Sequence, residues 1–175
     1  MKSAIPMTVV CALAMALFLS FPVNAQKAED AGGKQFMLNP IGTVQKEEGR
    51  TLLVLDKKFE QGLKGLEGFS HIQVFWWFDN NDTPQKRATL QVHPRGNKKN
   101  PLTGVFATRS PRRPNLIALT LCRVISIRDN IIEVEKIDAF AGTPILDIKP
   151  YIPGYDSTAG ASVPDWVKKL DKKNP

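Results

Sequence analysis

The feature that most constrains the fold is an alternation of apolar side chains with a period of two. In the segment 72–79 the even-numbered residues are all apolar: Ile72, Val74, Trp76 and Phe78. Successive side chains of a β-strand point to opposite faces of the sheet, whereas those of a helix repeat every 3.6 residues. The period of two therefore predicts a strand with one face in the core.

Other segments carry the same signature. The long apolar run 116–127 is followed by a polar turn and by 131–137, where apolar residues alternate with Glu133 and Glu135. This pattern predicts a β-hairpin with one solvent-facing side. Shorter strands are expected at 51–55, 88–93 and 145–148. Many short strands favour an all-β fold, a small closed or nearly closed antiparallel β-barrel, because closure leaves no unpaired strand edge.

Helical signals are few. Phe59, Leu63 and Leu66 are spaced by four and three residues, and glycines follow them, which predicts one short helix at 57–66. A second short helix is expected after Val163. The predicted barrel therefore carries one or two short helices.

The N-terminus has the features of a secretory signal peptide. Lys2 precedes an uncharged apolar run, 4–21, and Val23-Asn24-Ala25 has the small-x-small pattern of a cleavage site. An uncleaved membrane anchor is the alternative, since about 20 apolar residues can span a bilayer. We expect a secreted or periplasmic protein with no stable membrane association after cleavage. The expected divisions are a signal peptide at 1–25, a flexible leader at 26–35, a barrel domain at 36–155 and a C-terminal tail at 156–175.

Cysteine and histidine are too sparse for a disulfide or a metal site. Of the two cysteines only Cys122 lies beyond the expected signal peptide, so the mature chain cannot form an intramolecular disulfide. Two histidines and one cysteine offer no cluster with zinc-ligand spacing. We expect no metal.

Positive charge is concentrated in one part of the chain. The formal net charge is +7, and the window from Thr83 to Arg128 holds ten Lys or Arg and neither Asp nor Glu. Such a window can be a solvated face, or it can bind an anionic ligand such as a phosphate backbone. RNA or another anionic substrate is therefore one candidate partner.

Two stretches have residue choices that strand periodicity does not explain. The first runs from Val92-His93-Pro94-Arg95-Gly96 to the segment GVFATRSPRRPN at 104–115. Its prolines fix turns, and its arginines can bind carboxylate or phosphate through two parallel hydrogen bonds. A surface loop kept soluble by its charge is the alternative interpretation.

The second stretch is 137–151, which follows the predicted hairpin. Gly142 and Pro144 impose a turn there, and loops at a barrel rim often bind small ligands. The structural alternatives are that Asp138 caps this turn and that Asp147 forms an ion pair with Lys149 or a nearby arginine.

Four segments together resemble the signature blocks of the TsaA-like, TrmO-type family. They are NPIG at 39–42, GLEGFSH at 65–71, GVFATRSPRRPN at 104–115 and GTPILDIKPY at 142–151. The resemblance implies a small antiparallel β-barrel, usually a homodimer, that binds S-adenosylmethionine near the subunit interface. In the TrmO branch it implies methylation of N6 of threonylcarbamoyladenosine in tRNA.

The resemblance also assigns cofactor contacts. Arg109 matches the family's cofactor-contacting arginine. Other positions that fall where the family contacts the cofactor are Leu119, Asp138, Ala139, Phe140 and Ala141, with Asp79 and Asn80 matching by position only.

The expected function is therefore that of an S-adenosylmethionine-dependent methyltransferase of the TrmO type, whose substrate would differ if the protein is exported. Catalysis would rest on positioning and desolvation, and no catalytic residue is assigned. Arg95, Arg112 and Arg113 would face an anionic substrate. The alternative is a non-catalytic exported binding module for a small anionic or adenosine-containing ligand.

Overall fold

The computed structural model describes residues 36–171, so the expected signal peptide at 1–25 lies outside the described residues, as does the leader at 26–35. All the strands and helices below belong to one compact unit, which begins at Met37. Within the described range, no helix is long and apolar enough to cross a membrane.

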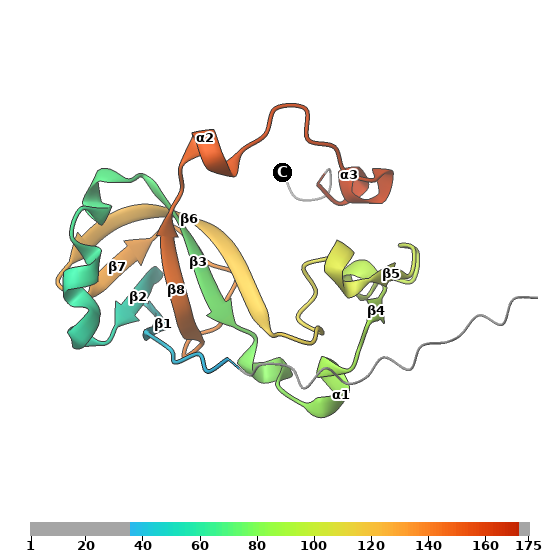
Figure 1. Ribbon diagram of the computed structural model, residues 1–175, viewed down its shortest axis with the longest axis horizontal. Coiled ribbons are helices and arrows are strands. Elements are labelled where there is room, and N and C mark those ends of the chain that lie inside the picture. Colours follow the sequence, from blue (N-terminus) through green and yellow to red (C-terminus); the bar gives the residue numbers. More distant parts are fainter. Residues whose placement is uncertain (1–35, 172–175) are drawn as a thin grey trace, which may run out of the picture. The chain divides into compact units, whose positions relative to one another are not determined.

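Six strands form a closed antiparallel barrel in the order β1-β2-β7-β6-β3-β8 (Figure 1). Their bounds are Gly42–Glu47 (β1), Arg50–Leu55 (β2), His71–Trp77 (β3), Ile117–Arg128 (β6), Ile131–Val134 (β7) and Pro144–Pro150 (β8). The predicted fold class is confirmed, and so is the hairpin, which is β6 and β7. The strand β1 was not predicted, because only Gly42 and Val44 of its six residues are buried.

The alternation in β3 decides which side chains fill the barrel. Ile72, Val74 and Trp76 are 0%, 0% and 6% exposed, whereas the odd-numbered residues of the strand are half-buried on the outer face. The other five strands of the barrel complete this core. Their core residues are Val44, Leu53, Leu55, Ala118, Cys122, Ile132, Val134 and Ile145. The core face predicted from the period of two is confirmed.

The helices are short. The helix expected at 57–66 is present as two 3₁₀ turns, η1 (Lys57–Leu63) and η2 (Leu66–Gly68). Gly65 separates them with a φ of 88°, in the left-handed region that interrupts a right-handed helix. At the C-terminal end lie α2 (Pro153–Asp156) and α3 (Asp165–Asp171), and α3 corresponds to the helix expected after Val163.

Between β3 and β6 the chain leaves the barrel in a long excursion, residues 78–116, which carries most of the basic window. Its elements are η3 (Asp79–Asn81), α1 (Pro84–Arg87), β4 (Gln91–Val92), η4 (Pro94–Gly96), β5 (Thr103–Gly104) and η5 (Val105–Ala107). The strand predicted at 88–93 was largely wrong. Only Gln91 and Val92 form a strand, because Ala88 ends α1 and β4 pairs only with the two residues of β5.

Candidate functional site

A pocket lies at the rim of the barrel, where β3 passes into the excursion and the turn after β7 approaches it. Its volume is about 260 Å³, close to the lower end of the ~300–1,000 Å³ typical of small-molecule sites. The lining residues are Trp76, Phe78, Asp79, Asn80, Asn81, Arg109, Pro111, Asp138, Ala139, Phe140 and Thr143. They come from three segments far apart in the sequence: 76–81, 109–111 and 138–143.

Aromatic rings form the apolar part of this rim pocket. Trp76 and Phe78 pack edge to face, with ring centroids 4.7 Å apart and planes at 65°. The indole Nε1 of Trp76 donates a hydrogen bond to Thr120 Oγ1 at 3.0 Å, which fixes the orientation of the ring. A fixed aromatic surface of this kind suits a flat ring such as a nucleobase.

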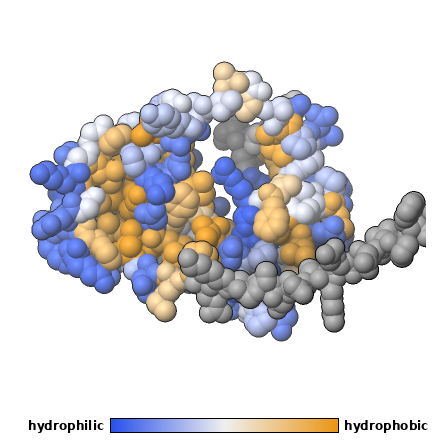
Figure 2. All heavy atoms as spheres, viewed as in Figure 1, coloured by the Kyte–Doolittle hydropathy of each residue, from blue (hydrophilic) through white to orange (hydrophobic). Residues whose placement is uncertain are grey.

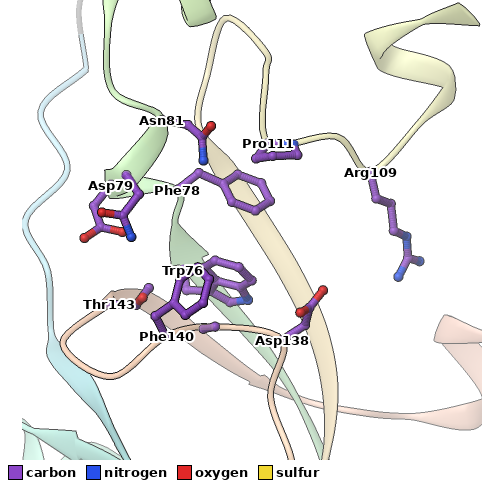
Figure 3. Close-up of a pocket in the computed structure, with 11 residues that line it drawn as sticks. Trp76, Phe78, Asp79, Asn81, Arg109, Pro111, Asp138, Phe140 and Thr143 are labelled. Atoms are coloured by element: carbon purple, nitrogen blue, oxygen red, sulfur yellow. The ribbon is translucent and has the colours of Figure 1, made fainter. Parts of the chain in front are cut away.

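Charged groups surround the aromatic part (Figure 3). Arg109, from the excursion, lies on the same side of the pocket as Asp138 in this view, and Asp79 lies on the opposite side. The three side chains belong to exposed residues, and none of them forms an ion pair with another described residue. The pocket can therefore offer two carboxylates and one guanidinium to a ligand that carries both signs of charge.

Six of the eight predicted cofactor positions line the pocket. They are Arg109, Asp79, Asn80, Asp138, Ala139 and Phe140. Ala141 is exposed beside the turn at Gly142 and does not line it. Leu119 is 41% exposed on the outer face of β6, opposite Phe75 of β3, and also lies outside the lining.

The arginines predicted to face a substrate lie outside the pocket, although on the same excursion. Arg95 and Arg112 are exposed, and Arg113 donates from Nη2 to the carbonyl of Val105 at 3.4 Å. Arg112 and Arg113 follow Arg109 by three and four residues, whereas Arg95 lies in η4.

Five lining residues were not predicted: Trp76, Phe78, Asn81, Pro111 and Thr143. Trp76 and Phe78 were assigned to the core face of a strand, and the signal that could have revealed their second role is that the strand ends there at Trp77. Thr143 lies in the Gly-Thr-Pro turn and is 2% exposed. In the part of the chain that the structure describes, no three His, Cys, Asp or Glu side chains are grouped to hold a metal ion.

The closed six-stranded antiparallel barrel with a pocket at its rim places the chain among small β-barrel proteins. Residues 34–157 match the family model of the tRNA-methyltransferase O N-terminal domain, and the chain belongs to this family. The resemblance noted in the sequence is thus confirmed.

Two relatives match this chain over most of their own length. A probable S-adenosyl-L-methionine-binding protein of Methanocaldococcus jannaschii is 48% identical over 114 residues, which are 65% of this chain and 90% of the relative. One from Pyrococcus horikoshii is 44% identical over 121 residues, 69% of this chain and 86% of the relative. The tRNA (adenine(37)-N6)-methyltransferase of Mus musculus is 44% identical over 111 residues, but these are only 25% of that protein.

Solved structures share the fold. A crystal structure of TrmO superposes with a TM-score of 0.59 at 31% identity over 74% of this chain and 63% of the other. TrmO from Pseudomonas aeruginosa gives a TM-score of 0.57 at 28% identity over 73% and 61%. The chain therefore spans less than two thirds of these TrmO chains.

Proposed function

We propose that the rim pocket binds S-adenosylmethionine and that the protein is a methyltransferase of the TrmO type. The observation that supports this most is the convergence of three distant segments on one pocket, which bring Arg109, Asp79 and Asp138 around an aromatic surface. Relatives named as probable S-adenosyl-L-methionine-binding proteins match 65% and 69% of this chain.

The chemistry of the lining fits this ligand. S-adenosylmethionine has an adenine ring, ribose hydroxyls, an ammonium, a carboxylate and a positively charged sulfur. Trp76 and Phe78 offer aromatic surface for the ring. Asp79 and Asp138 offer carboxylates for the hydroxyls or the ammonium, and Arg109 offers a guanidinium for the carboxylate.

The residues of this chain would act by orientation and by exclusion of water. When bound, S-adenosylmethionine supplies a methyl group activated by its positively charged sulfur. Arg109 would hold the carboxylate of the ligand, and Asp79 and Asp138 its ammonium or ribose hydroxyls, which would orient the methyl group toward the incoming nucleophile. The aromatic pair Trp76 and Phe78 would exclude water from that side.

We propose tRNA as the methyl acceptor, because relatives of this family in mammals are named tRNA (adenine(37)-N6)-methyltransferases. The basic excursion supports this proposal, since Arg95, Arg112 and Arg113 lie on the same excursion as Arg109 and can contact phosphates. A binding module without turnover is the second candidate. It is favoured by the archaeal relatives, which match this chain over 86–90% of their own length and are named only as binding proteins.

Isothermal titration calorimetry of the chain with S-adenosylmethionine tests the first proposal. We expect saturable binding, and we expect Arg109→Ala to weaken it by about 10- to 150-fold, because a charge-assisted hydrogen bond contributes about 1.5–3 kcal/mol. Arg128→Ala is the matched control, because Arg128 is an exposed arginine at the end of β6 that does not line the pocket. Absence of binding to the wild-type protein would contradict the proposal.

Transfer of a labelled methyl group to tRNA separates the enzyme from the binding module. We expect label in tRNA with the wild-type protein, and less with Arg112→Ala/Arg113→Ala, whose affinity for S-adenosylmethionine should stay unchanged because both residues lie outside the pocket. Cofactor binding without transfer to tRNA would favour the binding module.

A further inference from the structure

A polar clamp closes the base of the 78–116 excursion. Arg87, the last residue of α1, donates from Nε to Asp82 Oδ1 at 2.7 Å and from Nη2 to Asp82 Oδ2 at 3.0 Å. Its remaining group, Nη1, donates to the carbonyl of Pro114 at 2.9 Å. One guanidinium thus joins the chain where it leaves the barrel to the chain where it returns. Arg87 and Pro114 are 27 residues apart in the sequence.

The clamp is attached to the wall of the barrel through Trp77, the last residue of β3. The indole Nε1 of Trp77 donates to Asp82 Oδ2 at 3.3 Å, and the Arg87 guanidinium lies 5.3 Å from the centroid of the Trp77 ring. The hydrogen bond from Arg87 lowers the pKa of Asp82 and raises the pKa of Arg87, so both groups are charged at neutral pH.

Helix α1 also contacts the segment 79–81, which forms the first wall of the pocket. Lys86 Nζ donates to the carbonyl of Asn80 at 2.7 Å, and Asn80 lines the pocket. Thr83 Oγ1 accepts from the backbone N–H of Lys86 at 3.3 Å and so caps the helix that presents these two basic residues.

The segment 109–111 forms the second wall of the pocket, and Arg87 contacts the chain just beyond it. Pro114, whose carbonyl Arg87 binds, follows Pro111 by three residues and Arg109 by five. Nearer the barrel, the backbone N–H of Phe78 donates to the carbonyl of Leu116 at 2.8 Å. Arg87 adds a second tie farther out, on the side where Arg109 and Pro111 reach the pocket.

We propose that Arg87 is a positioning residue of the rim pocket, which holds the wall at 79–81 and the wall at 109–111 at a fixed separation. The proposal rests on the proposed function, because the pocket that it holds is the one assigned to S-adenosylmethionine. A ligand that contacts Asp79 and Arg109 at once depends on that separation. Lysine cannot replace Arg87, since its ammonium lacks the planar fork that binds a carboxylate and a carbonyl together.

Arg87→Lys tests this role through two measurements on the full chain. By calorimetry we expect its affinity for S-adenosylmethionine to fall about tenfold or more, because a misplaced binding group loses much of its contribution, with little change in the melting temperature. By amide hydrogen exchange of the ligand-free protein we expect faster exchange in 79–82 and 108–113 and unchanged exchange in β3 and β6. Arg128→Lys, the same substitution at an exposed arginine outside the clamp, should change neither measurement.

Asp82→Asn is the second variant, because it keeps the shape of the carboxylate but removes its charge; it should raise local exchange in the same segments. Wild-type exchange and affinity in Arg87→Lys would overturn the proposal, and so would faster exchange throughout the barrel in both variants, since Arg87 would then be a general stabiliser. If the wild-type protein does not bind S-adenosylmethionine, the proposed function fails, while hydrogen exchange still decides whether the clamp holds the two walls.

Discussion

Trp76 belongs at once to the barrel core and to the rim pocket. Its side chain is 6% exposed, its ring packs against Phe78, and its single polar atom donates to Thr120. A buried indole N–H needs an acceptor, and Thr120 provides it from the neighbouring strand β6. The orientation of one pocket residue therefore depends on the pairing of β3 with β6.

Replacement of Thr120 tests this dependence. Thr120→Val removes the acceptor with little change in shape and leaves the indole N–H buried without a partner, which should lower the free energy of unfolding by about 1–3 kcal/mol. Thr120→Ser keeps a hydroxyl and should recover most of that loss. Urea unfolding measures the free energy of unfolding of all three proteins. Equal values for Thr120→Val and wild type would show that this hydrogen bond contributes nothing to stability.

Cys122 is a second residue whose behaviour follows from burial. It is 0% exposed in the core, and burial raises the pKa of its thiol to about 12 from an ordinary value of 9.0. Between these two values the folded protein keeps a proton that the unfolded chain releases, so the free energy of unfolding must fall as the pH rises from about 9 toward 12.

Urea unfolding at pH 8 and pH 10 checks this sign. We expect wild type to lose more stability between the two pH values than Cys122→Ala, by up to about 1.4 kcal/mol per pH unit above the ordinary pKa of the thiol. Equal losses in the two proteins would contradict the assignment. In the native protein at pH 8 the thiol should also resist alkylation, which mass spectrometry detects.

At the scale of elements, β1 is the strand with the weakest sequence pattern, yet it closes the barrel. It pairs with β2 from Gly42 to Glu47 and with β8 through Gly42 and Thr43. At Gly42, where β1 pairs with both neighbours, the backbones of β1 and β2 come very close. A Cβ atom there would lie 2.3 Å from the carbonyl oxygen of Val54 and 2.6 Å from the Cα of Leu55.

Gly42→Ala should therefore destabilise the protein. The clash is with backbone rather than with a flexible side chain, so the strands must separate, at a cost of about 1–3 kcal/mol. Gly62→Ala is the control, because a Cβ on Gly62 meets no atom within 4 Å. Chemical unfolding of the two variants should show a loss for Gly42→Ala alone, and a fully stable Gly42→Ala would mean that β1 and β2 do not approach this closely.

At the scale of the whole molecule, the outer face of β6 is the surface that most needs explanation. Ile117, Leu119, Leu121 and Ile125 are 38–54% exposed on it, and Phe75 of β3 lies opposite Leu119. Figure 2 shows apolar side chains gathered over the strands of the barrel. Monomeric proteins rarely expose large apolar patches, whereas the interfaces of symmetric dimers bury them.

We predict a homodimer that uses this face. Light scattering of the wild-type protein at tens of micromolar should give twice the mass of the chain, and Leu119→Lys/Leu121→Lys should give the monomer mass with its secondary structure retained. Tyr155→Lys is the control, since Tyr155 is 86% exposed in α2, outside β6. A wild-type protein that is monomeric at this concentration would contradict the prediction.

The sequence alone determined the barrel and part of its site. The period of two at 72–78 predicted which side chains are interior, and the polar turn after Arg128 predicted the hairpin of β6 and β7. These features are local, because strand geometry and turn formation depend on neighbouring residues. Arg109, Asp138 and Asp79 were identified from motifs and their positions, and the structure groups them around one pocket.

Only the tertiary structure decided what depends on contacts between distant segments. Nothing in the local pattern indicates that β1 closes the barrel by pairing with β8 at Gly42 or that Thr120 accepts from Trp76, 44 residues earlier. The clamp at Arg87 is of the same kind, since its acceptor at Pro114 is a backbone carbonyl, a group that every residue carries. Side-chain periodicity indicates which face of an element is buried. It does not indicate which other segment packs against that face or provides the hydrogen-bond partner.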